Sequence, residues 1–379
     1  MKRKAVLATA YGSFTLAGAL YWGSLQMFLV DSGASNAVAT AVYSLPWIVG
    51  VASIPSGRLA DLYGYRRGIG VFAGLVAAAS LLPVIIEPSI VSAALSGLLN
   101  TAAWALLSPV FYEEAMTGMG EAEGAGLLVA AGSVGWTLGS GATGVIYSLH
   151  GIAGSAATAA AVEALMLPLL WASIDGEKRR GLIEALAMLP KWPRISSLGP
   201  AFLLEVFFAA YLASYELWCI TLYRILGDPR IYGASLAAAG IISAAATPLA
   251  SRIGGKRGAG ALSSLSAALF VFTNAAFIAT RSPVLLFAAF LTPLWPFTSV
   301  FSYMYAREKW GGATGPGVVE ALWSAAGAAA PLVGVLSDTV GVSAALLISC
   351  AVGAAALLLI GLAEKYYMGG GGVRLREEV

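Results

Sequence analysis

The chain has 379 residues, of which 59% are hydrophobic and only 11% are charged, and its formal net charge is +2. About a quarter of the residues of a soluble domain are charged, and its surface must be largely polar. A mean hydropathy of +0.81 over the whole chain therefore excludes a soluble enzyme, a nucleic-acid-binding protein and a disordered scaffold. We predict an all-α integral membrane protein.

Long apolar runs separated by short charged segments fill most of the chain. A membrane-spanning helix needs about 20 apolar residues. The first run is too long for a cleavable signal peptide and more runs follow it, and the absence of period-two alternation excludes outer-membrane strands. We predict twelve spans, at residues 5–30, 32–56, 68–86, 88–112, 124–149, 151–174, 195–223, 231–251, 258–280, 282–306, 311–337 and 339–363.

The distribution of Lys and Arg predicts the orientation of these spans, because basic residues concentrate in cytoplasmic loops. An even number of spans places both termini on one side. All but three of the 22 Lys and Arg, namely Arg224, Arg230 and Arg281, fall on that side. We therefore expect a multi-pass monomer of the cell membrane, embedded in the lipid bilayer with both termini in the cytoplasm.

The two halves of the chain resemble each other at an offset of 190 residues: Gly64 corresponds to Gly254, and Arg67 to Arg257. Parallel repeats of this kind occur in transporters, with a binding site at the repeat interface. We predict an N-terminal bundle over residues 1–174 and a C-terminal bundle over 195–363. A cytoplasmic linker at 175–194, with a short amphipathic helix, joins them, and a cytoplasmic tail follows at 364–379.

The loop between the second and third spans reads GRLADLYGYRR over residues 57–67. It resembles the signature loop of the major facilitator superfamily, G-x-L-A-D-x-x-G-x-[RK]-[RK], and lies where that family places it. The resemblance implies twelve transmembrane helices in two pseudo-symmetric six-helix bundles. It also implies a secondary transporter that moves a small solute by alternating access.

The same loop predicts a contact between the halves. Glycines permit a tight turn and a close helix approach, and a carboxylate can accept hydrogen bonds from the amides at a helix N-terminus. The resemblance implies that Asp61 caps the eleventh span near residues 311–317, and that Arg66 pairs with a carboxylate of the fourth span. This contact would latch the halves in the outward-facing state; the alternative is that the basic residues serve topology only. The latch candidates are Gly57, Asp61, Gly64, Arg66, Glu113 and Glu114.

Four carboxylates lie inside predicted spans, where a charge costs about 2.5–3.5 kcal/mol and therefore needs a reason. Glu205 and Glu216 are eleven residues apart, close to three helical turns, so they share one face. The resemblance implies that their span lines the cavity, which makes them candidates for coupling or substrate binding. Glu320 is a further candidate, although hydration near the cytoplasm would also explain it. Glu163 fits a structural role as well as a functional one. Asp338, at the outer end, is expected to be solvated.

Aromatic and amide side chains inside the spans complete the candidates, with plain packing as the alternative for each. The set is Tyr21, Gln26, Asn100, Trp104, Tyr211, Tyr215, Trp295, Tyr303 and Trp323. The sequence has no metal-ligand cluster, catalytic triad or Walker loop. We therefore expect no metal, no cofactor and no nucleic-acid partner.

These observations favour a secondary transporter of a small organic solute, with protons as a candidate second partner. The alternatives are an uncoupled facilitator, a transporter-fold sensor or binding protein, and an intramembrane enzyme; the last needs a residue constellation that one histidine, His150, does not supply. The absence of Lys and Arg inside the spans disfavours an anionic substrate, and the scarcity of Asn and Gln disfavours a sugar. An amphipathic or cationic organic compound remains.

Overall fold

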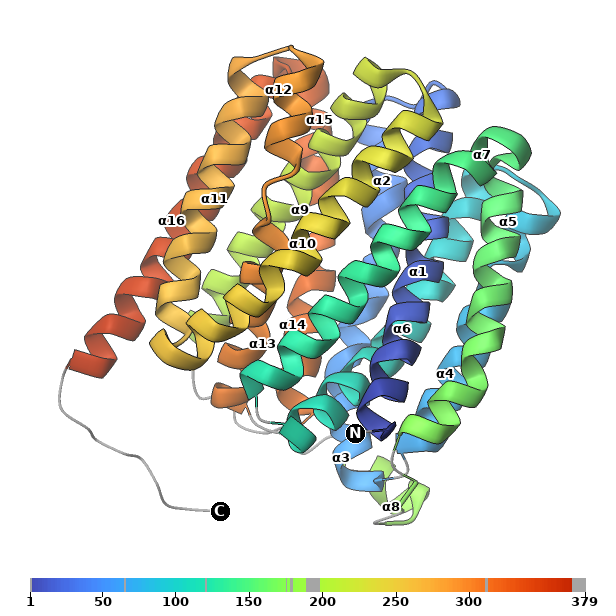
Figure 1. Ribbon diagram of the computed structural model, residues 1–379, viewed down its shortest axis with the longest axis vertical. Helices are drawn as coiled ribbons and strands as arrows, with labels where there is room; N and C mark the ends of the chain where they lie inside the picture. The colour runs from blue at the N-terminus through green and yellow to red at the C-terminus, as the bar shows by residue number, and fades with distance from the viewer. Residues whose placement is uncertain are drawn as a thin grey trace.

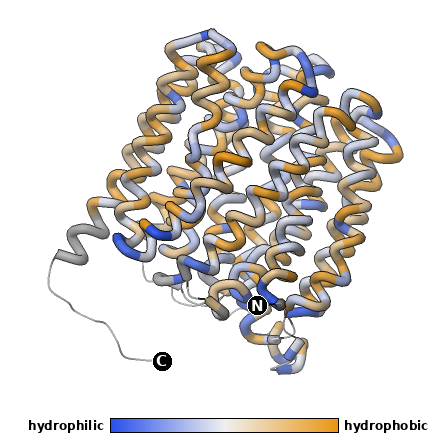
Figure 2. Tube along the Cα trace, viewed as in Figure 1, coloured by the Kyte–Doolittle hydropathy of each residue, from blue (hydrophilic) through white to orange (hydrophobic). Residues whose placement is uncertain are grey.

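The computed structural model describes residues 2–64, 66–119, 121–174, 176–177, 180–188, 198–310 and 313–369. Throughout these ranges the regular elements are helices (Figure 1). Eleven helical stretches of the described chain are long and apolar enough to cross a membrane. Apolar residues extend along the helices while hydrophilic ones gather toward the ends of the bundle (Figure 2).

One of these stretches, Glu123–Ser173, contains two spans. It has 51 residues, and a straight helix of that length would measure about 77 Å at 1.5 Å per residue, against a hydrocarbon core of about 30 Å. Gly151 divides it, with a non-helical backbone at φ 61° and ψ −162° that a residue with a Cβ rarely adopts. Figure 1 shows the helix folding back on itself there. The predicted twelve-helix fold is confirmed.

Six spans precede the short helix α8 (Leu182–Met188). They are built from α1 (Lys2–Asp31), α2 (Asn36–Ser44), the 3₁₀ helix η1 (Leu45–Ala52), α3 (Ser53–Tyr63), α4 (Arg66–Ser80), α5 (Leu82–Ile86), α6 (Ile90–Met119) and α7 (Glu121–Ser173).

Six further spans follow α8. They are built from α9 (Leu198–Leu226), α10 (Pro229–Arg257), α11 (Ala259–Ala279), α12 (Pro283–Phe290), α13 (Leu294–Trp310), α14 (Thr314–Gly327), α15 (Ala330–Val340) and α16 (Val342–Gly369).

Besides the third span, which is divided at Leu81 between α4 and α5, three spans are interrupted along their length. The second passes through η1, the tenth breaks between α12 and α13, and the eleventh breaks between α14 and α15. Pro46, Pro293 and Pro331 lie at or beside these breaks, where the missing amide and the ring disfavour a continuous helix. Irregular backbone inside a membrane is tolerated where it is buried or lines a cavity, so the breaks point to the middle of the protein.

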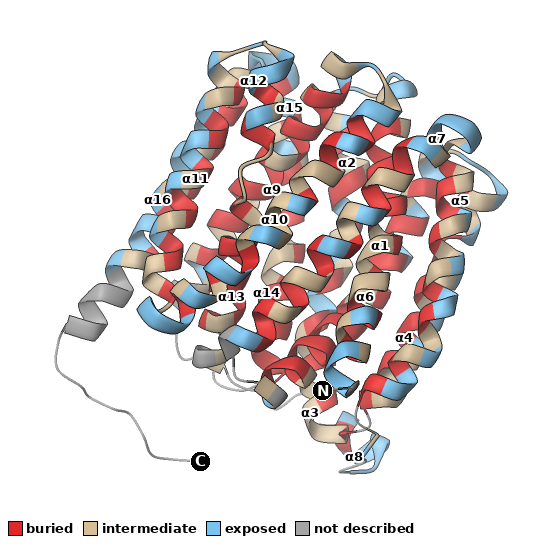
Figure 3. Ribbon diagram, in the orientation of Figure 1, coloured by how far each residue is buried: buried red, intermediate tan, exposed pale blue. Residues whose placement is uncertain are grey.

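The helices run between two ends of the bundle (Figure 1). We call the end where α1 begins and α16 ends the terminal end, and the opposite end the far end. Buried residues face the interior, while exposed ones lie along the outer sides of helices such as α11 and α16 (Figure 3). Phe272 and Leu362, each at least 60% exposed, are large apolar side chains on this outer surface, as expected for contact with lipid.

The predicted linker is only partly visible. The amphipathic segment forms α8 at the terminal end, and the amide of Arg180 donates to the carbonyl of Tyr63 at 3.4 Å. Residues 175, 178–179 and 189–197 of the linker region lie outside the described residues, as do 370–379 of the tail. The domain boundaries therefore stay predictions.

Candidate transport cavity and its two closures

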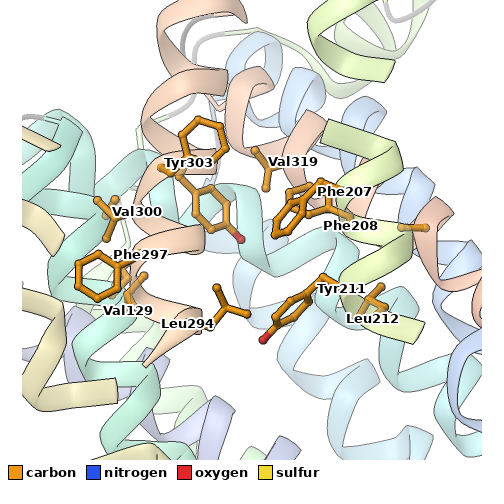
Figure 4. Close-up of a cluster of buried hydrophobic side chains, with 14 of the residues drawn as sticks. Val129, Phe207, Phe208, Tyr211, Leu212, Leu294, Phe297, Val300, Tyr303 and Val319 are labelled. Atoms are coloured by element: carbon orange, nitrogen blue, oxygen red, sulfur yellow. The ribbon is translucent and has the colours of Figure 1, made fainter. Parts of the chain in front are cut away.

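A cavity of about 280 Å³ lies between the two halves. This volume is just below the range of about 300–1,000 Å³ that is usual for small-molecule pockets. Side chains from α7, α9, α13 and α14, among them Val129, Tyr211, Tyr303 and Val319, meet in this region (Figure 4). The three interrupted spans all contribute, through residues such as Trp47, Thr292 and Trp323.

Aromatic rings dominate the cavity wall. Of the sequence candidates, Asn100, Trp104, Tyr211, Tyr215, Trp295, Tyr303, Glu320 and Trp323 line the cavity. Sequence reasoning did not select Trp22, Trp47, Tyr112, Trp136 or Trp218, which also line it. Each of these residues is an aromatic residue inside an apolar span, so the sequence did mark them as possible candidates. Hydropathy, however, does not distinguish aromatic residues that line a cavity from those packed in a core.

Glu320 joins the two halves at the cavity wall. Its carboxylate accepts hydrogen bonds from Trp104 Nε1 at 2.9 Å and from Ser108 Oγ at 2.8 Å, both on α6 of the first half. The hydroxyl of Tyr303 on α13 also donates to it. Tyr303 in turn stacks on Tyr112, with ring centroids 3.7 Å apart. The buried carboxylate is thus the centre of a hydrogen-bonded bridge between the halves.

Glu163 is the second carboxylate of the cavity wall, and it lies entirely within the first half. Asn100 Nδ2 donates to Oε1 of Glu163 at 3.1 Å and approaches Ser80 Oγ at 3.3 Å. Oε2 of Glu163 is buried and has no hydrogen-bond partner. The side chain is 1% exposed, so the oxygen without a donor lies in a buried part of the cavity wall.

The other candidates lie away from the cavity wall. Glu216 accepts a hydrogen bond from Ser44 of α2 and is buried, whereas Glu205 is half-buried, with an unpartnered Oε2. Gln26 accepts from the hydroxyl of Tyr232 at 2.7 Å, and Tyr21 donates to the carbonyl of Ala93. Glu205 and Glu216 were expected to line the cavity, and the structure places them elsewhere. Their role in coupling stays a prediction.

The charge of the cavity wall is therefore acidic. Glu163 and Glu320 line it, and no Lys, Arg or His does so among the residues that the structure describes. Nor do the described residues contain a group of His, Cys, Asp and Glu that could hold a metal ion.

At the terminal end, α3 closes against α14. Oδ1 of Asp61 accepts from the amide of Ala313 at 3.4 Å, and Oδ2 accepts from Thr314 Oγ1 at 3.1 Å. A helix N-terminus has unpaired amides and a partial positive charge, so Asp61 caps α14 from the opposite half. Gly57 lies so close that an added Cβ would be 2.5 Å from the carbonyl oxygen of Ala313. Residues 311–312 of the expected contact lie outside the described residues.

An ion cluster lies beside this cap. Arg66 is 3.4 Å from Asp61, 3.9 Å from Glu113 and 3.2 Å from Glu114. Glu113 is also 3.7 Å from Arg307 on α13 of the second half. Arg66, Glu113 and Glu114 have side chains less than one-tenth exposed. Gly64, which follows α3, has φ 79°, the left-handed conformation that ends the helix and turns the chain toward Arg66.

At the far end, α15 closes against α2 in the same manner. Oδ1 of Asp338 accepts from the amide of Asn36 at 3.2 Å, and Oδ2 accepts from the amide of Ala37 at 2.9 Å. Asn36 Nδ2 also donates to Ser337 Oγ at 2.8 Å. Asp338 was expected to be only solvated. It is exposed, but it caps a helix of the other half, a contact that depends on which helix lies opposite and that the sequence alone does not reveal.

Two further contacts hold the far end. The hydroxyl of Tyr223 on α9 donates to Asp31 Oδ1 at 2.9 Å, and Arg224 donates to Asn36 Oδ1 at 2.6 Å. Both join the second half to the first. The cavity therefore lies between two closures, each made by contacts between the halves.

The chain thus consists of two halves of six spans around a central cavity. Solved structures with this fold include the nucleoside transporter NupG, with a TM-score of 0.64, 15% identity and coverage of 97% of this chain and 100% of that chain. The human organic anion transporter MFSD10 (TETRAN) has a TM-score of 0.68 at 16% identity, over 96% of this chain and 98% of that one. A POT family transporter in complex with 5-aminolevulinic acid has a TM-score of 0.74 at 11% identity, over 96% of each chain.

The chain therefore has the fold of the major facilitator superfamily, as the signature loop implied. No protein-family model and no curated protein matches the sequence.

Proposed function

We propose that the chain is a secondary transporter that moves a small organic solute across the cell membrane by alternating access. The observation that carries this proposal is the cavity of about 280 Å³ that lies between two halves which contact each other at both ends. A binding site at the interface of two repeats, reached by rocking one against the other, is the arrangement expected of a transporter. The similar solved structures named above are transporters, which supports transport over catalysis.

The two closures provide the states of the cycle. In the proposed mechanism, loss of the Asp338 cap opens the far end while the Asp61 cap keeps the terminal end shut. Loss of the Asp61 cap opens the terminal end while Asp338 holds the far end. Each cap is a helix-end interaction of about 0.3–2 kcal/mol, small enough for solute binding to shift the balance.

We propose proton coupling as the driving force, with the uncoupled facilitator as the alternative. Ionisable residues inside a membrane commonly mark proton or substrate paths. The cavity carboxylates Glu163 and Glu320 stand first for that role, and Glu205 and Glu216 remain candidates outside the cavity wall.

The test is a thermal-shift screen of the purified protein against small organic solutes, followed by uptake into proteoliposomes. Accumulation of a hit that follows an imposed pH gradient supports the coupled transporter. Gradient-independent equilibration supports the facilitator. Hits that bind and never cross would overturn transport and leave a sensor or binding protein.

The proposed orientation, with the terminal end in the cytoplasm, is tested separately by single cysteines in whole cells. Cysteines at Glu123 and Arg180 should react only with reagents that enter the cytoplasm. Those at Ser89, Gly154 and Pro229 should react from outside. Reaction of the Arg180 position from outside contradicts the orientation.

A further inference from the structure

Glu163 lines the cavity and has one acceptor oxygen without a donor. One of its oxygens is held by Asn100, while the other is buried without a donor. We propose that Glu163 and Asn100 form the subsite that binds the positively charged group of the transported solute, an organic ammonium with a flat apolar body. The inference rests on the proposed transport function and names the chemical class of the cargo.

The surroundings of Glu163 favour a cation as the partner of its ionised form. An ionised carboxylate buried in a membrane protein requires a partner, because its desolvation is expensive. The polar contacts that the structure gives this residue come to Asn100, which is neutral, and through it to Ser80. The cavity wall offers no Lys or Arg among the described residues, and its other charged group is Glu320, which is also acidic. A cationic solute would supply the missing partner.

Glu320 is the less suitable anchor because its acceptors are already used. Trp104, Ser108 and Tyr303 all donate to its two oxygens. A cargo cation could bind there only by displacing donors that join the halves. We therefore assign Glu320 to the bridge and Glu163 to cargo binding.

The aromatic wall beside Asn100 fits the rest of such a molecule. The ring of Trp22 reaches α6 at Gly97, where an added Cβ would be 3.1 Å from its outer edge. Gly97 and Asn100 are three residues apart and thus neighbours on one helix face. Trp22 also contacts Trp47, with ring centroids 5.7 Å apart. Aromatic faces attract cations within about 6 Å of the ring centroid, so the rings that line the same cavity are further partners for an ammonium bound in it.

The available length limits the cargo. On α6, Asn100 contacts Glu163 and Ser108 contacts Glu320. These two positions are eight residues apart, which corresponds to about 12 Å along the helix. Within a cavity of about 280 Å³, a single aromatic ring on a short chain fits between these levels. This size selects small aryl-alkyl ammonium compounds rather than extended ones.

The experiment compares a cation with its neutral isostere. Isothermal titration of the purified full-length protein measures the Kd of 2-phenylethylammonium and of 2-phenylethanol. We expect the ammonium to bind more tightly, and Glu163→Gln to weaken it roughly tenfold or more while the alcohol changes by less than about twofold, because hydrogen bonds to charged groups are the stronger ones. Glu87→Gln, at an exposed carboxylate beyond α5, is the matched control and should leave both Kd values unchanged.

A second variant separates charge from folding. Glu163→Asp keeps the charge on a shorter side chain and should retain more ammonium affinity than Glu163→Gln. The proposal is overturned if the wild type shows no preference for the ammonium, if both ligands weaken together, or if Glu163→Gln binds the ammonium normally.

Flux measurements keep this test distinct from that of the function. If the ammonium binds through Glu163 but does not enter proteoliposomes, the proposed subsite stands and the proposed transport function is overturned. If a solute is transported and Glu163→Gln does not change its transport, the proposed transport function stands and the proposed subsite is overturned.

Discussion

The two ends of the bundle are closed by the same pair of spans in opposite ways. At the terminal end, Asp61 at the end of the second span caps the start of the eleventh. At the far end, Asp338 at the end of the eleventh span caps the start of the second. Each of the two spans therefore ends in a carboxylate that caps the start of the other span. The two caps lie at opposite ends of one cavity.

The surroundings of the two caps differ. The Asp61 cap is backed by a buried cluster in which Arg66 is close to Glu113 and Glu114. The Asp338 cap is exposed, and the charged groups of the contacts beside it, Arg224 with Asn36 and Asp31 with Tyr223, are not gathered into a buried ion cluster. Buried ions are screened little by salt, whereas exposed charges are screened strongly. The terminal closure should thus be the more robust one, and the far closure the one that solution conditions adjust.

The largest effect should come from filling the close approach at one end. An added Cβ at Gly317 would be 2.6 Å from the carbonyl oxygen of Ser53, and one at Gly334 would be 2.8 Å from that of Asn36. Gly317→Val should therefore prevent terminal closure and Gly334→Val far closure, each lowering transport more than about tenfold. Cysteine accessibility from each side measures which end is open.

Gly255→Val is the control for this pair, because an added Cβ there meets nothing within 4 Å. Like the other two glycines, Gly255 lies within a spanning helix, but it is exposed. If Gly317→Val and Gly334→Val opened the same end, the two closures would not be alternatives.

The next effect concerns the bridge at Glu320. Glu320→Gln keeps the shape but replaces one acceptor oxygen by a donor, so one of the groups Trp104, Ser108 and Tyr303 loses its acceptor. A buried donor left unpaired costs about 1–3 kcal/mol. Cysteine labelling at the terminal end should increase in this variant. Ser108→Ala removes one donor and should have a smaller effect; equal labelling in all three proteins would show that the bridge does not contribute to closure.

The caps themselves should have opposite effects of similar size. Asp61→Asn should favour opening of the terminal end, and Asp338→Asn opening of the far end. Each should change the ratio of open states by roughly 2- to 30-fold, the equivalent of about 0.3–2 kcal/mol. The double variant should restore the ratio toward that of the wild type. A double variant that resembles either single one would show that the caps are not balanced against each other.

The sequence predicted the spans and the Asp61 cap, but it did not predict the corresponding Asp338 cap at the far end. Hydropathy located the spans, including the turn at Gly151, because lipid imposes apolar side chains over a set length. The loop motif suggested the Asp61 contact. Asp338 has no such motif, and its partner lies some 300 residues away in sequence, so only the packing of the eleventh span against the second reveals it.

The carboxylates illustrate a second limit. An eleven-residue spacing places Glu205 and Glu216 on one face of the seventh span, but it does not say which neighbour that face meets. In the structure Glu216 meets Ser44 rather than the cavity. Glu163, for which the sequence left a structural and a functional role open, lines the cavity, and Asn100 of α6 donates to its side chain.

The smallest effect, and the sharpest test of the difference between the ends, is that of salt. Raising the ionic strength from 0.1 M to 1 M shortens the Debye length from about 10 Å to about 3 Å. The exposed Asp338 cap should weaken by a few tenths of a kcal/mol, whereas the buried cluster around Arg66 should change less. Cysteine labelling at the far end should therefore increase with salt while labelling at the terminal end falls. Asp338→Asn should reduce this dependence, since the charge of the cap is gone and only those of Asp31 and Arg224 remain at the far end, and Asp61→Asn should preserve it. An opposite shift, toward opening of the terminal end, would mean that salt reaches the Arg66 cluster and that the terminal closure is the weaker of the two.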